Sequence, residues 1–370
     1  MTPFGVISDS HTHKWSQFAT VLPNGLNSRL NDILVEIRQA ARDVKAAGGD
    51  TLYHCGDLFH VRGSVSPEVT NPLIDTVLEI VMDGVKLVIL TGNHDLESRN
   101  SNAASSACEM LRTLPDVTIV TSPTVFWEDK VAMVPWYDSL DEVRAKIKVV
   151  KDLIELGDPD LGFAPQDLSE FSLMLHAPIN GVLIGIPDAG FYSKELEVLG
   201  FKYVFSGHYH AHKEFPGNVF SVGATTHQTW NDVGTKSGHL IVTPAGVDHV
   251  SDKAPKFINY DLSWDAFAAA AAVDGNFVRV VLGTATEEDI EFIRDQIMAD
   301  GAKGVTVNAI PVPKGTVTTR TAPVASAVVT TRDSVKQWID TDTASEDPAF
   351  INDVQALAKL VMDETESVTV

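Results

Sequence analysis

The sequence predicts an α/β protein in which two packed β-sheets are covered by helices, with a small α/β module towards the C-terminus. Strand-like and helix-like patterns alternate through the early part of the chain, which is typical of a largely parallel sheet with helices on its faces. From residue 117 consecutive strands follow without an intervening helix, which indicates a second sheet packed against the first.

Three strand–helix pairs build the first predicted sheet. The expected strands are the aliphatic runs at 4–8, 51–55 and 86–90, and the expected helices span 27–47, 67–82 and 103–114. Leu30, Ile33 and Ile37 recur at the spacing of one apolar helix face. Pro67 suits the first turn of the second helix, where a missing N–H costs no hydrogen bond.

The next segments predict the second sheet and the strands that close the fold. Strands are expected within 117–136 and over 171–176 and 203–207, with a charged helix over 140–156. Residues 218–226 and 239–250 are expected to form a closing antiparallel segment, because both are rich in β-branched residues.

Three domains are predicted, with a boundary near residues 251–256. The first is the two-sheet domain, 1–252. The second is a cap, 253–332, with strands over 277–282 and 304–310, a helix over 287–298, and a Thr- and Val-rich linker or edge strand at its end. The third is a helical tail, 333–370, whose apolar stripe either packs onto the cap or docks onto a partner.

Composition and charge exclude several classes of protein. No apolar run approaches the roughly 20 residues that cross a bilayer, and the N-terminus lacks a signal-like core. Two cysteines cannot form a disulfide framework, so a reduced, cytoplasmic chain without membrane contact is expected. The 28 basic and 50 acidic residues give a formal net charge of −22, which disfavours non-specific nucleic-acid binding unless metal ions or a partner assist.

Polar residues follow the carboxyl ends of five predicted strands. They are Asp9 and His11, Asp57 and His60, Asn93 and His94, His176, and His208 and His210. Ligands bind outside the carboxyl ends of the strands in open parallel sheets, so these side chains are expected to meet at one edge. Carboxylates, imidazoles and an amide oxygen suit Mn, Fe, Zn or Ni. The sequence therefore predicts a metal site.

Two metal ions account for this ligand set. One ion would be held by Asp9, His11 and His210, and the other by Asn93, His176 and His208. Asp57 would bridge them. Two ions about 3.5–4 Å apart can activate a water and clamp a phosphoryl group. His94 is not needed for coordination, so it is placed to stabilise charge or to protonate the leaving oxygen.

The ordered motifs D-x-H, G-D, G-N-H-D, H and G-H-x-H resemble the calcineurin-like metallophosphoesterase superfamily, over residues 4 to about 250. The resemblance implies a four-layer αββα sandwich, the metal ligands named above, and His94 as the catalytic histidine. GDLFHVR (56–62), GNHDLESRN, and SGHYH leading into NVFSVGATT are similar to the SbcD-type DNA repair nucleases, especially the phage T4-type recombination nuclease. In that family the residue matching His60 assists exonuclease action.

The narrower resemblance implies a DNA exonuclease or endonuclease. It would favour Mn²⁺, with Mg²⁺, Fe, Zn and Ni left open, and would act with an SbcC-like ATPase, and as a homodimer, in DNA recombination or processing. The alternative is a small-molecule phosphodiesterase or phosphatase of the same superfamily, which fits the acidity and the Thr12-His13 pair that replaces the usual L-G. A non-catalytic binding platform is disfavoured, because such chains lose ligands and none is missing here.

Overall fold

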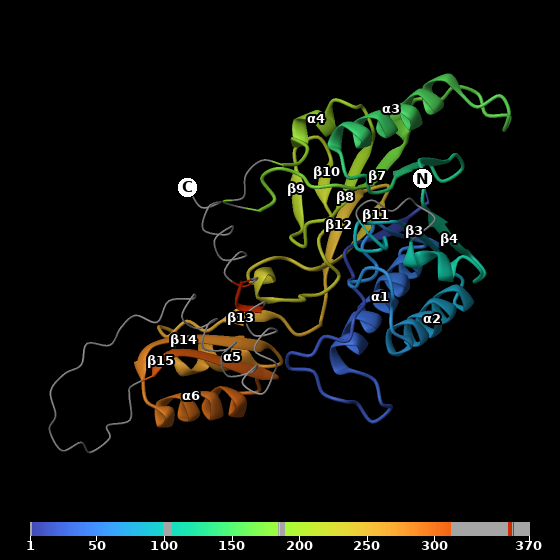
Figure 1. Ribbon diagram of the computed structural model, residues 1–370. Coiled ribbons are helices and arrows are strands. Elements are labelled where there is room, and N and C mark those ends of the chain that lie inside the picture. The colour runs from blue at the N-terminus through green and yellow to red at the C-terminus, as the bar shows by residue number, and fades with distance from the viewer. Residues whose placement is uncertain are drawn as a thin grey trace, which may run out of the picture. The chain divides into compact units, whose positions relative to one another are not determined.

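The computed structural model describes residues 2–98, 106–183, 185, 189–311, 354–356 and 358 (Figure 1). Residues 1–312 form one compact unit and residues 313–370 a second. The predicted linker or edge strand at 316–332 and most of the predicted helical tail lie outside the described residues; within the tail, 354–356 and 358 are helical. Among the described helices, none combines the length and the apolar content that spanning a bilayer requires.

The first sheet has six strands in the order β12-β11-β1-β2-β3-β4. They are β1 (Phe4–Ile7), β2 (Thr51–His54), β3 (Lys86–Leu90), β4 (Val117–Val120), β11 (Gly238–Thr243) and β12 (Gly246–Ser251). Strands β1 to β4 are parallel, and β11 pairs antiparallel with β1 and with β12. Helices α1 (Ser28–Ala46) and α2 (Pro67–Met82) begin at the capping side chains of Asn27 and Ser66. Both match the predicted helices closely.

The second sheet also has six strands, in the order β5-β6-β7-β8-β10-β9. They are β5 (Thr124–Phe126), β6 (Val131–Val134), β7 (Ser172–His176), β8 (Tyr203–Gly207), β9 (Lys213–Phe215) and β10 (Val219–Ser221). Every residue of β7 is buried, as expected for a parallel strand covered on both faces. Helices α3 (Leu140–Leu156) and α4 (Ser193–Glu197) pack on the outer face of this sheet (Figure 1).

The two sheets pack face to face and form the central core. Successive residues of a strand point to opposite faces: in β2, Leu52 packs against the helices, whereas Tyr53 packs against the other sheet. The rings of Phe4 and Phe205, one from each sheet, have centroids 6.4 Å apart. The arrangement of helices, sheet, sheet and helices confirms the predicted αββα sandwich.

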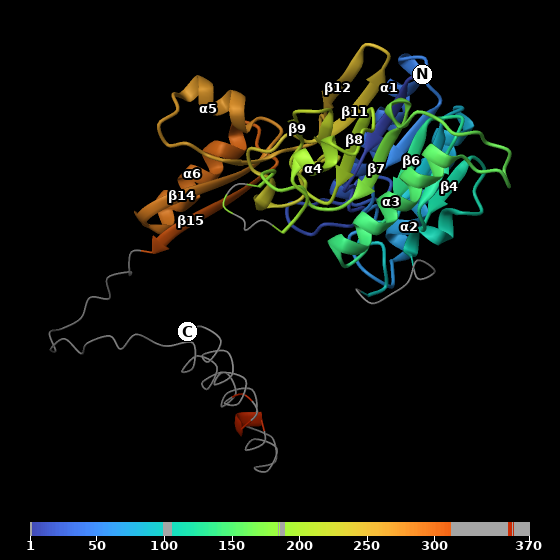
Figure 2. The same ribbon diagram turned by 90° about the horizontal axis from the view of Figure 1, so that it is seen from above.

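A three-stranded parallel sheet follows the sandwich; two of its strands, β14 and β15, are orange in Figure 2. It contains β13 (Phe257–Asn259), β14 (Phe277–Ala285) and β15 (Gly304–Pro311), with α5 (Ala266–Val273) and α6 (Glu287–Ala299). Val278, Val280 and Ile297 form a small core of their own. These elements include the strands and the helix predicted for the cap; the domain boundary near residue 252 stays a prediction.

Two elements of the structure differ from the sequence prediction: the pairing of β10 and the type of the helix within 103–114. The pattern at 218–226 predicts a closing antiparallel partner for 239–250, but β10 pairs parallel with β8 in the second sheet, and only β11 and β12 close the first. A β-rich run does not encode its direction; here the short β9 reverses the chain and pairs antiparallel with β10. The helix predicted over 103–114 is a 3₁₀ helix at Ala107–Leu111, capped by Ser106, and residues 103–105 lie outside the described part of the chain.

Candidate metal centre

The predicted polar residues lie together at the carboxyl ends of the parallel strands. His176 is the last residue of β7, and His208 directly follows β8. The carboxyl edges of the two sheets meet, because His176 Nε2 of the second sheet lies 3.4 Å from Asp57 Oδ2, which follows β2 of the first. The structure therefore brings strand ends that are far apart in sequence to one site.

Four of the candidate ligands have a left-handed backbone. The φ angles are 48° at Asp9, 41° at His11, 58° at Asp57 and 100° at His208. This conformation costs about 1–3 kcal/mol per non-glycine residue, and it persists where the surrounding structure enforces it, often at functional sites. At Asp9, His11 and Asp57 the loops after β1 and β2 enforce it jointly, since the N–H of Asp9 donates to the Gly56 carbonyl and that of His11 to the Asp57 carbonyl.

Asp95 holds two of the site loops together, although the sequence pattern assigned it no role. Its buried carboxylate accepts hydrogen bonds from the backbone N–H groups of Asp57 (3.0 Å), Gly92 (2.9 Å) and Phe59 (2.9 Å). Burial, together with the negative charge of Asp57, raises the pKa of Asp95 to about 7. Asp95 thus fixes the loop after β2 against the loop after β3, which carries Asn93 and His94.

The first donor group consists of Asp9, His11 and His210, whose ligating atoms lie within 4.8 Å of one another. His210 Nδ1 lies 2.9 Å from a carboxylate oxygen of Asp232. Because a carboxylate accepts, Nδ1 carries the hydrogen and Nε2 remains as the nitrogen for a metal. Sequence reasoning missed Asp232, which lies in a loop without periodic pattern.

The second donor group consists of Asn93, His176 and His208. Asn93 Oδ1 lies 3.1 Å from His176 Nε2 and 3.1 Å from His208 Nδ1. Two ligand atoms at right angles, each about 2.1 Å from one ion, are about 3.0 Å apart, so this spacing fits a common ion. His176 Nδ1 donates to the Cys55 carbonyl at 2.7 Å, which leaves Nε2 for the site.

Asp57 lies between the two donor groups. Asp57 Oδ2 is 3.7 Å from His11 Nε2 and 3.4 Å from His176 Nε2. Asp9, Asp57 and His176 also gather their ligating atoms within 4.8 Å. Burial opposes the charge of Asp57, but the imidazoles of His176 and His11 outweigh it and hold the pKa of Asp57 well below its usual range.

Metal binding is expected to release a proton from His176. Burial acts to lower the pKa of this imidazole, but the charges of Asp57 and Asp9 prevail and raise it to about 9. An ion that binds Nε2 must displace this proton, so its apparent affinity should rise about tenfold per pH unit below that pKa. Calorimetric titration with Mn²⁺ in buffers of different ionisation enthalpy measures the release. Binding without proton release would contradict the use of His176 as a ligand.

His94 and His60 border the first donor group. His94 Nδ1 donates to the His60 carbonyl at 2.8 Å, which leaves Nε2 free. The two rings stack at a centroid distance of 5.6 Å, and His60 Nδ1 lies 3.3 Å from His11 Nδ1. Trp15 packs on His60 from the loop after β1, with ring centroids 4.4 Å apart. His60 therefore contacts both a candidate ligand and the predicted catalytic histidine.

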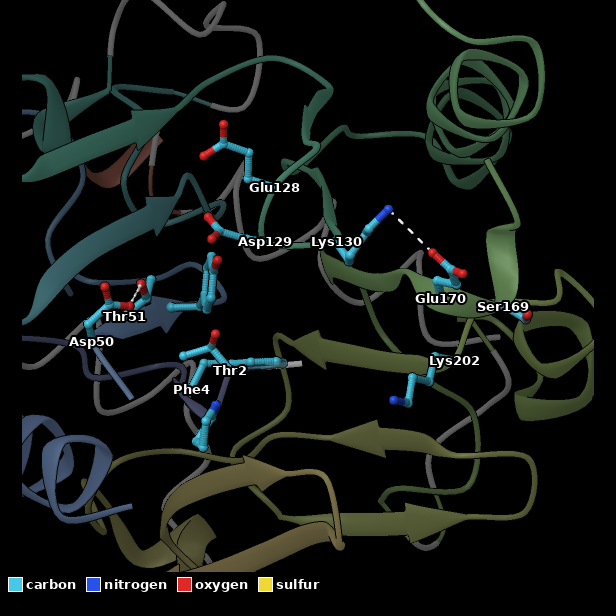
Figure 3. A pocket seen from close by; sticks show the side chains of 12 residues that line it. Thr2, Phe4, Asp50, Thr51, Glu128, Asp129, Lys130, Ser169, Glu170 and Lys202 are labelled. Atoms are coloured by element: carbon cyan, nitrogen blue, oxygen red, sulfur yellow. Dashed lines mark hydrogen bonds and ion pairs between the residues drawn. The ribbon is translucent and has the colours of Figure 1, made fainter. Parts of the chain in front are cut away.

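A polar cavity of about 490 Å³ lies at the opposite, amino ends of the strands (Figure 3). Asp50 precedes β2 and Lys202 precedes β8, and an ion pair of 3.3 Å joins Lys130 to Glu170 across its wall. None of the candidate ligands lines this cavity. The chemistry suggested by the strand ends therefore belongs to the other edge of the sandwich.

Comparison with known proteins gives matches to phosphoesterases and nucleases. Residues 2–212 match the Metallophos family model, described as calcineurin-like phosphoesterase. Over 193 residues the chain is 25% identical to exonuclease subunit 1 of Enterobacteria phage T4; the match covers 50% of this chain and 51% of that protein, so the chain spans about half the length of this relative.

Two solved structures align with most of their own length. A dimetal phosphatase from Danio rerio aligns with a TM-score of 0.37 and 10% identity, covering 65% of this chain and 91% of that one. The nuclease MPE from Pseudomonas putida aligns with a TM-score of 0.27 and 12% identity, covering 66% and 86%. The family match includes more than half of the residues and every candidate metal ligand, and the chain belongs to the calcineurin-like phosphoesterase family.

Proposed function

We propose that the chain is a metal-dependent DNA nuclease that hydrolyses phosphodiester bonds at a dinuclear metal centre. The position of Asp57 carries this proposal, because one carboxylate oxygen lies within 3.7 Å of a nitrogen of the first donor group and within 3.4 Å of one of the second. Membership of the family implies divalent metal ions. The likeness to an exonuclease subunit supports a nucleic-acid substrate.

The residues present fit two divalent ions. Asp9, His11 and His210 would hold one ion, Asn93, His176 and His208 the other, and Asp57 would contact both. Carboxylate, amide and imidazole donors suit Mn²⁺ and leave Mg²⁺, Fe, Zn and Ni as competitors. When bound, two such ions would neutralise charge on the phosphoryl group and acidify an attacking water. The protein side chains would hold the metal ligands in place and would donate a proton to the leaving oxygen.

His94 is the proposed source of that proton. Its Nδ1 is engaged by the His60 carbonyl, so a proton on Nε2 is the one available to the leaving 3′ or 5′ oxygen as the P–O bond breaks. Its own backbone N–H donates to Asp57 Oδ1 at 2.7 Å, which ties the position of His94 to the candidate bridging carboxylate. His60 positions His94 through its carbonyl and His11 through its ring.

DNA binding must overcome the charge of the chain. A formal net charge of −22 repels a polyanion at long range, so affinity has to come from the metal centre and from a second protein. An SbcC-like ATPase is the proposed partner, supported by the name of the phage relative as one subunit of an exonuclease. Co-elution of the two purified proteins in size-exclusion chromatography, with DNA cleavage stimulated by the ATPase, is the expected result.

Hydrolysis assays with added Mn²⁺ test the proposal. The substrates are linear double-stranded and single-stranded DNA, bis-p-nitrophenyl phosphate and cyclic dinucleotides. Degradation of DNA at low salt that disappears with excess chelator is the expected result. Turnover limited to the small diesters, with DNA intact in the presence of the ATPase, would instead establish a small-molecule phosphodiesterase, the function that the acidity of the chain favours.

A further inference from the structure

We propose that Asp232 is a positioning residue for His210, and that the loop carrying it, residues 225–236 (the Asp232 loop), couples the first donor group to the three-stranded sheet. The inference rests on the proposed metal centre and goes beyond it, because Asp232 would determine how tightly one of the two metal positions binds. Asp232 itself touches neither substrate nor reacting atoms in this scheme; it acts through the His210 ring.

Both oxygens of the Asp232 carboxylate are fixed by hydrogen bonds. Oδ1 accepts from His210 Nδ1 at 2.9 Å, and Oδ2 accepts from the backbone N–H groups of Gln228 (2.8 Å) and Thr229 (2.7 Å). The residue is only 2% exposed, so water does not compete for these bonds. A carboxylate held in this way fixes the tautomer and the orientation of a metal-binding imidazole and increases its basicity.

The Asp232 loop also supports Asp9, another member of the first donor group. Gln228 Nε2 donates to the carbonyl of Asp9 at 2.6 Å, and Thr225 Oγ1 donates to the carbonyl of Ser8 at 3.1 Å. Asp9 has a left-handed backbone, which needs such support. Within the described residues, no hydrogen bond joins the loop to Asn93, His176 or His208. The support is therefore selective for the first donor group.

The opposite side of the Asp232 loop contacts the three-stranded sheet. The backbone N–H of Phe257, the first residue of β13, donates to His227 Nδ1 at 3.1 Å. Trp230 packs edge-on against the Phe257 ring at 4.8 Å, and the guanidinium of Arg279 on β14 lies 4.8 Å from the Trp230 ring centre. The loop thus has one face on β13 and β14 and the other on the candidate metal site.

Arg29, on α1 of the sandwich, strengthens this junction between the Asp232 loop and the three-stranded sheet. It is 5% exposed, its Nη2 donates to the Gln228 carbonyl at 2.5 Å, and its guanidinium lies 5.0 Å from the Phe257 ring and 5.4 Å from the Phe277 ring. A shift of the three-stranded sheet would therefore move Arg29 and Gln228. Gln228 bonds to the Asp9 carbonyl and to Asp232, and Asp232 bonds to His210, so the shift would reach both ligands. Loosening the junction should weaken the first metal position and spare the second.

Stepwise Mn²⁺ titration of the full chain tests the inference. Asp232→Asn keeps the shape of the side chain, but an amide cannot accept from His210 and from both backbone N–H groups at once. We expect the affinity of one of the two positions to fall about 10–100-fold, as for other outer partners of metal-binding histidines. Arg279→Ala, at the far side of the loop, should shift the same position in the same direction by a smaller factor. Excess Mn²⁺ should restore kcat in both variants.

The matched control is Asp252→Asn, which also removes a buried carboxylate. Asp252 bonds to Lys256 and to the Ala254 N–H and to no candidate ligand among the described residues. Unchanged stepwise affinities in Asp232→Asn, with two ions bound by the parental chain, would overturn the inference and leave the proposed function standing. A parental chain that binds no pair of ions would overturn the proposed function itself. Equal weakening of both positions by Asp232→Asn and Asp252→Asn would indicate a general structural effect and would also overturn the inference.

Discussion

Replacing Asp57 by asparagine is expected to abolish hydrolysis and to prevent two ions from binding together. Asp57 Oδ2 lies 3.7 Å from His11 Nε2 and 3.4 Å from His176 Nε2, so its negative charge serves both donor groups. A neutral amide cannot offset two divalent charges at a buried position. The loss of affinity should exceed the ~10–100-fold typical of residues outside the coordination shell. Metal content after gel filtration and hydrolysis of bis-p-nitrophenyl phosphate measure the two effects.

Asp50→Asn is the matched control for this substitution. Asp50 lies at the amino end of β2, beside the cavity at the opposite edge, and pairs with Lys86. Its replacement should leave metal content and turnover at the parental level. Thermal unfolding with and without Mn²⁺ separates loss of metal from loss of fold, because the parental chain should gain stability from the ions and the Asp57→Asn chain should not. Two tightly bound ions in an active Asp57→Asn chain would refute the bridging role.

Replacing His94 by alanine is expected to lower kcat by about 10²–10⁴ and to leave metal content unchanged. The Nδ1 of His94 bonds to the His60 carbonyl, and in the proposed mechanism Nε2 protonates the leaving oxygen. Alanine retains the backbone N–H that donates to Asp57 Oδ1, so the candidate bridging carboxylate should stay in position. Steady-state kinetics and metal analysis of the same preparation test both parts of the prediction.

The leaving group of the substrate makes the test of His94 specific. A p-nitrophenolate leaves without a proton, whereas the alkoxide of a nucleotide diester needs one. The His94→Ala defect should therefore be large on a dinucleotide and small on bis-p-nitrophenyl phosphate. His249→Ala, which removes a half-buried histidine stacked on His212, serves as the control. An equal defect on both substrates would show that His94 acts otherwise than as a general acid, and parental rates on both would remove it from the mechanism.

The sandwich and the position of the candidate site were predictable because both depend on local pattern. Runs such as LVIL (87–90) and LML (173–175) are apolar throughout, as buried parallel strands must be, and each is followed by a polar residue. Parallel strands of one sheet end at the same edge, so Asp57 after β2 and Asn93 after β3 had to lie close once the topology was known. Direction is not encoded in this way, which explains the wrong pairing predicted for β10.

The supporting residues could not be predicted, because their partners are set only by the folded chain. Asp232 lies 22 residues after His210 in a loop with no apolar period, and Gln228 reaches the carbonyl of Asp9 across 219 positions. Asp95 stands next to recognised motif residues, but its three bonds go to backbone N–H groups that no sequence pattern reveals. The left-handed backbone at Asp57 is equally invisible in sequence, since such angles are usual only for glycine.

Electron paramagnetic resonance of the chain loaded with Mn²⁺ tests the proposed dinuclear centre most directly. Two Mn²⁺ ions that share the Asp57 carboxylate should give an exchange-coupled spectrum at full loading, and Asp57→Asn should convert it to the six-line spectrum of isolated ions or abolish binding. Spectra of isolated ions from the parental chain at every loading, or saturation with a single ion, would contradict a dinuclear centre at the carboxyl ends of these strands.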